Sequence, residues 1–243
     1  MIFGNNINTR TKIIASIAIF SALYAVLRPV PIGLMIGLGE RFSVSDFLAP
    51  LYGIILGPYI GGLSIITGTF MGMLGKPPVF LGLDFLPALI NTISIGYLIK
   101  QKRKYIISLN LLLIIFVILN PFTTLFIGSI PFFWLHIIAL LVLISPLGHN
   151  AGNWVKTLDP KNLTIGIATL AFIGTMMQHL TGVLLTELVF GHVLSSISLE
   201  TFSTIIWPSA FLLYPWERIA LIILSVIIGV PVIKTLKKSQ FLF

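Results

Sequence analysis

The feature that most constrains this chain is a series of long apolar stretches that follow one another over almost its whole length. A helix that crosses a bilayer needs about 20 mostly apolar residues. Charged residues make up only 9% of the chain, against about 25% in an ordinary soluble domain. So few charges cannot cover a surface that faces water. The sequence therefore predicts an integral membrane protein and excludes a soluble enzyme or a soluble nucleic-acid-binding domain.

The apolar stretches predict an all-α fold, a polytopic membrane helix bundle with about eight transmembrane helices. The expected helices lie at 13–30, 44–57, 58–75, 84–100, 105–120, 131–147, 163–190 and 208–233. The second stretch is short and is followed at once by a turn-forming Gly57-Pro58 pair, so six or seven spans remain open. The longest polar segments leave no room for a soluble domain. We therefore expect a single integral membrane domain over residues 1–243.

The basic residues predict an orientation for this bundle. The chain has 15 Lys and Arg against 7 Asp and Glu, and in an eight-span arrangement most basic residues fall on one side. These eleven are Arg10, Lys12, Lys100, Lys102, Arg103, Lys104, Lys156, Lys161, Lys234, Lys237 and Lys238. Because cytoplasmic loops carry an excess of Lys and Arg, we expect a multi-pass protein of the cell membrane with both termini cytoplasmic. The charge is then explained by topology and lipid headgroups, not by a nucleic-acid partner.

Several kinds of catalytic site have no support in the sequence. The chain has no cysteine, which excludes thiol catalysis and iron–sulfur clusters. A phosphate-binding loop needs a Gly, four residues, then Gly-Lys-Ser/Thr, but Gly75-Lys76 is followed by Pro77 and Phe70 stands at the first glycine position. His-Glu-x-x-His and Gly-x-Ser-x-Gly patterns are absent, and the four histidines are far apart along the chain. We therefore expect no catalytic residue, no bound metal, no cofactor and no enzymatic activity.

Small residues recur on one face of the first expected helix. They are Ala15, Ala18, Ala22 and Ala25, at spacings of three and four. Small residues let helices approach closely in lipid. Two interpretations remain open, namely packing inside the bundle and docking to a partner membrane subunit.

Polar side chains in the apolar stretches are candidates for substrate binding, since ionisable groups are costly inside a membrane. The candidates are Tyr24, Asp84, Asn91, His179, Glu187 and Glu217. Several of them fall toward the outer side, so we expect an outward-facing pocket closed by the 28–43 and 76–83 loops. The alternatives are structural. Asp46 and Asp84 can simply cap helices, and Arg218 can pair with Asp46, Asp84 or Glu187. Because neighbours on a helix point to different sides, Glu217 and Arg218 should need separate partners.

Three blocks of the sequence carry a resemblance to a known family. They are IASIAIFSALYAVLRPVP, DFLAPLYGIILGPYIGGLSIITGTFMGMLG, and the pair MQHLTGVLLTELVFG and YPWERIALIILSVIIGVPVIK. Together they cover about half the chain. With its Ala18-x-x-x-Ala22 pattern and its Gly-rich second and third helices, the chain resembles the substrate-binding S component of an energy-coupling factor (ECF) vitamin transporter.

The resemblance implies a fold, a function and partners. Such S components bind a vitamin or similar small micronutrient near the outer face. They dock through the small-residue face of helix 1 onto a separate transmembrane coupling subunit, and separate ATPase subunits power import. Residues 1–104 would hold the first four helices of a six-helix core, 105–147 an inserted hairpin, and 163–235 the last two helices.

Two other functions remain open on the residues alone. A stand-alone secondary transporter, coupled to protons, would use His179 and Glu187 as a proton relay. An intramembrane enzyme would use Glu187, His179 or Glu217 as acid or base, although no paired-carboxylate or metal-ligand spacing supports it. The chain contains no clear internal repeat of the kind that many transporters have.

Overall fold

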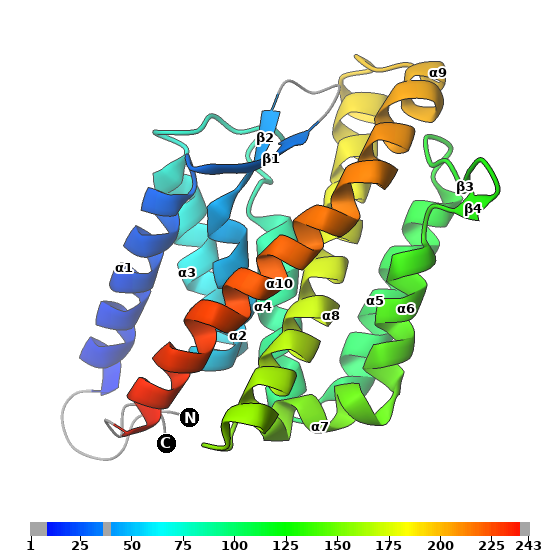
Figure 1. Cartoon of the computed structure of the whole chain (residues 1–243). Helices are drawn as coiled ribbons and strands as arrows, with labels where there is room; N and C mark the ends of the chain where they lie inside the picture. The colour runs from blue at the N-terminus through cyan, green and yellow to red at the C-terminus, as the bar shows by residue number, and fades with distance from the viewer. Residues whose placement is uncertain (1–8, 36–39, 239–243) are drawn as a thin grey trace.

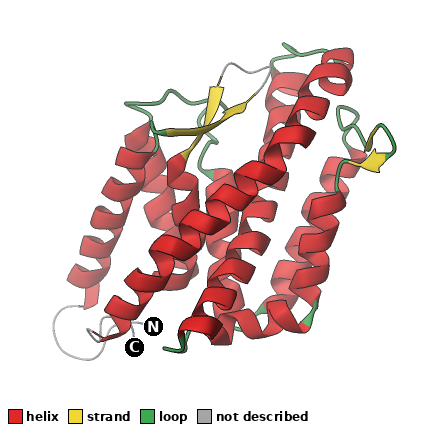
Figure 2. Cartoon of the chain, viewed as in Figure 1, coloured by secondary structure: helices red, strands yellow, loops and turns green. Residues whose placement is uncertain are grey.

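The computed structural model describes residues 9–35 and 40–238, and these are mostly helical (Figure 2). The helices are α1 (Thr9–Leu27), α2 (Leu48–Ile55), α3 (Gly57–Gly72), α4 (Leu86–Ile99), α5 (Arg103–Leu119), α6 (Trp134–Ile144), α7 (Pro146–Trp154), α8 (Pro160–Thr186), α9 (Leu199–Thr201) and α10 (Trp207–Lys238). A 3₁₀ turn over Val44–Phe47 precedes α2. Wider π-helical turns follow α8 over Glu187–Val193 and connect α9 to α10 over Phe202–Ile206. Each of the eight apolar stretches thus contains a helix.

Two short antiparallel hairpins modify the all-α prediction. Strand β1 (Pro31–Met35) pairs with β2 (Glu40–Ser43), and β3 (Phe126–Ile127) pairs with β4 (Ile130–Pro131). Both hairpins lie at the end of the bundle away from the start of α1 and the end of α10 (Figure 1). The coarse expectation of a helical bundle is confirmed, and the strands are confined to the connections between helices.

The eight transmembrane spans are not confirmed. Three helical segments in the described part of the chain are long and apolar enough to cross a membrane, namely Arg10–Leu27, Pro160–Val193 and Leu199–Lys238. A fourth is obtained if α6 and α7, which meet at an angle of 67°, count as one span. Helices α3 and α5 reach only 16 and 17 residues. The apolar stretches are interrupted by turns, as at Gly57, whose φ of +76° ends one helix and begins the next.

Helix α7 was not expected, because it lies in the polar segment 148–162. It begins where Ser145 accepts a hydrogen bond from the amide of Leu147 and Pro146 occupies the first turn, a combination that favours a helix start. The adjacent helix α8 is capped in the same way by Asp159, which accepts from the amide of Asn162. Capping residues thus form a helix where hydropathy alone predicts a loop.

The glycine-rich segment around the turn at Gly57 forms a tight helical hairpin, α2–α3. A Cβ atom on Gly53 would lie 2.6 Å from the carbonyl oxygen of Thr92, and one on Gly96 would lie 2.4 Å from the backbone nitrogen of Pro58. The hairpin and α4 therefore touch through their backbones. Close approach of this kind requires glycine.

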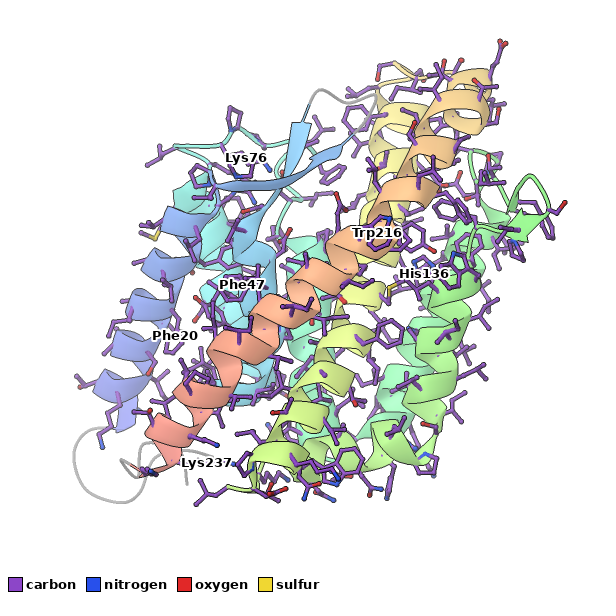
Figure 3. The ribbon with its side chains drawn as sticks, viewed as in Figure 1. Phe20, Phe47, Lys76, His136, Trp216 and Lys237 are labelled. Carbon is purple, nitrogen blue, oxygen red and sulfur yellow. The ribbon has the colours of Figure 1, made fainter. Side chains whose placement is uncertain are left out.

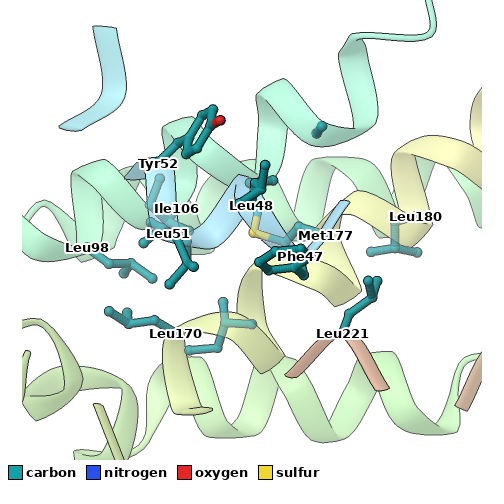
Figure 4. Close-up of a cluster of buried hydrophobic side chains, with 14 of the residues drawn as sticks. Phe47, Leu48, Leu51, Tyr52, Leu98, Ile106, Leu170, Met177, Leu180 and Leu221 are labelled. Atoms are coloured by element: carbon teal, nitrogen blue, oxygen red, sulfur yellow. The ribbon is translucent and has the colours of Figure 1, made fainter. Parts of the chain in front are cut away.

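Helix α8 forms the centre of the bundle. In its most apolar window, 72% of the residues are buried, compared with 11% in α1 and 22% in α10. Apolar side chains of α2, α4, α8 and α10 meet in the cluster shown in Figure 4, which includes Phe47, Leu51, Leu170, Met177 and Leu221. This core holds together the helices that border the cavity described below.

The basic loops gather at one end of the bundle. Lys237, near the end of α10, donates to the carbonyl oxygens of Val155 and Thr157 at 2.6 and 2.9 Å (Figure 3). Arg103 donates to the carbonyl of Ile144 at 2.9 Å. The start of α1 lies at the same end (Figure 1). The segments that contain the eleven basic residues therefore lie at the same end of the bundle. The predicted arrangement, with most basic residues on one side, requires this.

Candidate functional site

A cavity of about 130 Å³ lies in the half of the bundle away from this basic end. The end of α1, the β1–β2 hairpin, the 73–85 loop, α8 and α10 contribute its walls. Its charged lining consists of three basic and three acidic side chains: Arg28, Lys76, Arg218, Asp46, Asp84 and Glu217. The lining therefore has no net formal charge but contains six charged groups. Charged groups inside a membrane are costly, and they are candidates for function.

Arg28 and Asp84 form an ion pair that ties α1 to the loop above the cavity. Their side chains meet at 3.1 Å, and each is only 6% exposed. Asp84 also accepts hydrogen bonds from the backbone amides of Val79 and Phe80 at 2.9 and 3.1 Å. Because these amides precede Asp84 and α4 begins only at Leu86, the aspartate shapes the loop and does not cap the helix.

Asp46 lies in the 3₁₀ turn before α2, where it accepts a hydrogen bond from the hydroxyl of Tyr24 at 3.4 Å. The N-cap of this segment is Ser43, which accepts from the amide of Ser45 and donates to the carbonyl of Arg28 at 2.8 Å. Asp46 is therefore not the capping residue either. Its carboxylate borders the cavity together with the serine.

Glu217 and Arg218 form an ion pair with each other. The Arg218 Nη2 and Glu217 Oε2 atoms lie 3.6 Å apart, which corrects the expectation that adjacent residues need separate partners. Long side chains can bend toward each other even when their Cα–Cβ bonds diverge. Arg218 also donates to the carbonyl of Thr175 at 3.3 Å, so the pair joins α10 to α8.

Aromatic rings form the wall of the cavity between α8 and α10. His179 and Tyr214 stack with their ring centres 4.6 Å apart and their planes 19° from parallel. His136 on α6 contacts His179 through a 2.9 Å hydrogen bond between Nε2 and Nδ1, and both imidazoles are buried. Trp207 completes the wall. Histidines that are far apart in the sequence are thus direct neighbours in the fold.

Three of the six predicted binding residues line the cavity, namely Asp84, His179 and Glu217. Two others lie directly behind it. Tyr24 contacts Asp46, and Asn91 donates to the side-chain oxygen of Gln178, a lining residue, at 2.8 Å. The structure thus brings five of the six predicted side chains to one region.

Glu187 lies elsewhere. It is fully buried and accepts a hydrogen bond from Thr123 in the segment that connects α5 to the β3–β4 hairpin. Thr186 lines the cavity, and the next residue turns away because successive helical residues point roughly 100° apart. Glu187 follows His179 by eight residues, which is about 80° around an α-helix, so the two side chains leave the helix in different directions.

Four residues that line the cavity were not predicted to bind a substrate: Arg28, Lys76, Gln178 and Tyr214. Two further lining residues, Asp46 and Arg218, were considered only as structural groups. Arg28, Lys76 and Arg218 do not belong to the eleven basic residues predicted for the cytoplasmic side. This exception was the signal that could have identified them. Gln178 and Tyr214 carried no such signal.

The loops expected to close the pocket contribute to it in part. Ser43 from the first loop and Lys76, Val79 and Phe80 from the second are lining residues. Residues 36–39 of the 28–43 loop lie outside the described residues. In the described ranges, no cluster of three or more His, Asp or Glu side chains is arranged to hold a metal ion.

The small-residue face of α1 points out of the bundle for most of its length. Ala15, Ala18 and Ala22 are exposed, and Ala25 is half-buried, with its Cα 3.3 Å from a Cβ placed on Gly72 of α3. Ser21, on the face toward α3, donates to the carbonyl of Ser64 at 3.1 Å. Internal packing thus explains Ala25 but not the other three.

Comparison with known proteins shows limited similarity. The chain is 27% identical over 154 residues to an uncharacterized protein of Methanocaldococcus jannaschii, an alignment that covers 62% of this chain and 50% of the relative. The chain thus spans about half the length of that relative. No protein-family model and no solved structure matches the chain.

Proposed function

We propose that this protein is a membrane-embedded substrate-capture subunit of an ATP-driven importer for a vitamin or a similar small micronutrient. The observation that carries the proposal is the cavity at the end of the bundle opposite the basic face. Under the positive-inside rule, this end faces outward. A solute would then enter beneath the β1–β2 hairpin and the 73–85 loop, among the charged and aromatic side chains already described.

In this proposal, ATP binding belongs to other subunits. The chain carries no phosphate-binding loop, and a separate transmembrane coupling subunit would contact the exposed face formed by Ala15, Ala18 and Ala22. Small exposed residues of this kind permit close helix–helix contact in lipid. The resemblance of these segments to ECF S components supports the same division of labour, with both termini cytoplasmic.

Mass spectrometry of the purified protein tests the proposal. We expect the protein, extracted in mild detergent, to retain a small molecule at a ratio near one to one, released on denaturation. A D84A variant should lose this molecule, because Asp84 holds the loop above the cavity, whereas D159A, at the exposed cap of α8, should retain it. A protein that neither retains nor binds any member of a micronutrient panel contradicts the proposal.

A second function, proton-coupled secondary transport, is favoured by one specific observation. The buried His136–His179 pair places an exchangeable proton beside the cavity, as in the proton relays of transporters. Uptake into proteoliposomes that contain only this protein distinguishes the two functions. Accumulation driven by a proton gradient, and lost in H136Q, favours the secondary transporter; uptake that requires ATPase partners favours the capture subunit.

A further inference from the structure

Glu217 presents a buried carboxylate to the cavity without a hydrogen bond. Its side chain is 8% exposed, and no group among the described residues donates a hydrogen bond to either oxygen. The Arg218 guanidinium at 3.6 Å compensates the charge but lies beyond hydrogen-bond distance. Because an unsatisfied buried carboxylate is costly, a ligand that donates a hydrogen bond to Glu217 removes this cost.

The other two carboxylates at the cavity already have donors. Asp84 accepts from Arg28 and from two backbone amides. Asp46 accepts from the hydroxyl of Tyr24. Glu217 is therefore the acidic lining residue with the most unused acceptor capacity.

Two aromatic residues of the wall have their polar atoms engaged outside the cavity. The Nε1 atom of Trp207 donates to the carbonyl of Phe122 at 2.7 Å. The hydroxyl of Tyr214 donates to the carbonyl of Phe132 at 3.3 Å. Each residue thus offers the cavity only ring surface, which favours a planar apolar or aromatic group.

The size and charge of the cavity restrict the ligand further. A volume of about 130 Å³ is close to that of an engineered cavity of about 150 Å³ that accepts benzene. It suits a single ring better than a nucleoside. The equal numbers of basic and acidic lining residues leave no excess positive charge for a phosphate group.

From these observations we infer that the cavity binds a planar, single-ring nitrogen heterocycle, neutral or singly protonated, whose N–H group donates to Glu217. This inference rests on the proposed function, because it names the class of solute that the cavity would capture. The aromatic wall would contact the ring, and the carboxylate would select ligands that carry a donor.

Matched pairs of probes test this inference on the full chain in detergent. 4-Aminopyrimidine and pyrimidine differ in the amino donor. Cytosine and cytidine share that amino group and differ in the ribose, which replaces the N1–H of cytosine. Binding is measured by isothermal titration calorimetry and by the fluorescence of Trp207, with a W207F variant to assign the signal. We expect 4-aminopyrimidine to bind at least about tenfold more tightly than pyrimidine, the effect of a hydrogen bond to a charged group. Cytosine should bind, and cytidine should not.

The variants E217Q and E187Q separate the role of Glu217 from a general effect of removing a buried carboxylate. E217Q should lose most of the preference for 4-aminopyrimidine over pyrimidine, whereas E187Q, which alters a carboxylate outside the cavity, should keep it. The comparison of 4-aminopyrimidine with pyrimidine uses the unmodified protein, so this part of the test holds even if a variant fails to fold.

Each of the following results would overturn the inference. Equal affinity for 4-aminopyrimidine and pyrimidine, or an unchanged preference in E217Q, refutes the role of Glu217, and cytidine binding as tight as cytosine binding refutes the size limit. If mass spectrometry finds a retained solute without a ring, the ring assignment fails while the capture function stands. A protein that binds neither the ring probes nor any micronutrient contradicts both.

Discussion

The ion pair between Arg28 and Asp84 should dominate the stability of the end of the bundle that holds the cavity. Substituting Asp84 by Ala leaves the Arg28 guanidinium buried without its 3.1 Å partner. It also removes the acceptor of two backbone amides. Breaking a buried ion pair by removing one partner costs about 3–5 kcal/mol. For a chain of this size, about 2–4 °C is lost per kcal/mol, so we expect D84A to lower the unfolding temperature by roughly 6–20 °C.

A double-mutant cycle isolates the pair from other effects of the substitution. The variants D84A, R28M and R28M/D84A are unfolded in mixed micelles, and amide hydrogen exchange is measured for Val79 and Phe80. The double variant should recover part of the lost stability, because it leaves no unpaired charge. The two amides should exchange faster in both variants that lack Asp84.

The control for this experiment is D159A, which removes an exposed helix cap. It should cost only about 1 kcal/mol, the usual value for such a cap. A D84A variant no less stable than D159A would refute the reasoning. So would an effect of R28M that is the same in the presence and absence of Asp84.

Three further predictions concern other parts of the molecule. Trp at Ala18 and Ala22 should block co-purification with a coupling subunit without changing solute binding, because both positions are exposed; assembly that survives both substitutions removes the docking role. G96A should destabilise the protein by about 1–3 kcal/mol, as overpacking does, because its Cβ would meet the backbone of α3. At Gly182 a Cβ would meet nothing within 4 Å, so G182A should be neutral or stabilising by up to about 1 kcal/mol. Equal denaturation midpoints for G96A and G182A would contradict this account. W207F should lose about 1 kcal/mol with its indole hydrogen bond, which chemical denaturation measures.

Part of the candidate site was accessible from the sequence. Asp84, His179 and Glu217 were predicted because a polar group in an apolar stretch requires compensation. The same reasoning proposed Glu187, which instead lies against Thr123. Eight residues separate Glu187 from His179, which is about 80° around a regular helix, so a polar residue in the same apolar stretch need not face the same cavity.

The pairs that side chains form could not be predicted from the sequence in the same way. Arg28 and Asp84 are separated by 56 positions, and His136 and His179 by 43. The sequence restricted the partners of Arg218 to three acidic residues, and the structure shows a fourth, Glu217, beside it. Such pairs depend on which helices lie next to each other, and hydropathy carries no information about helix adjacency.

The sequence by itself determined that the chain is a bundle of apolar helices, where the apolar helices lie, and where glycine allows close packing, although it did not predict α7. These properties depend on local composition, since hydropathy, capping and glycine content act within a few residues. Only the tertiary structure decided how many helices are long enough to cross a membrane, that two hairpins lie at one end, and which charges meet around the cavity. The reason is that turns such as that at Ser145, inside the stretch 131–147, divide apolar stretches. In addition, a buried charge finds its partner through contacts between distant segments.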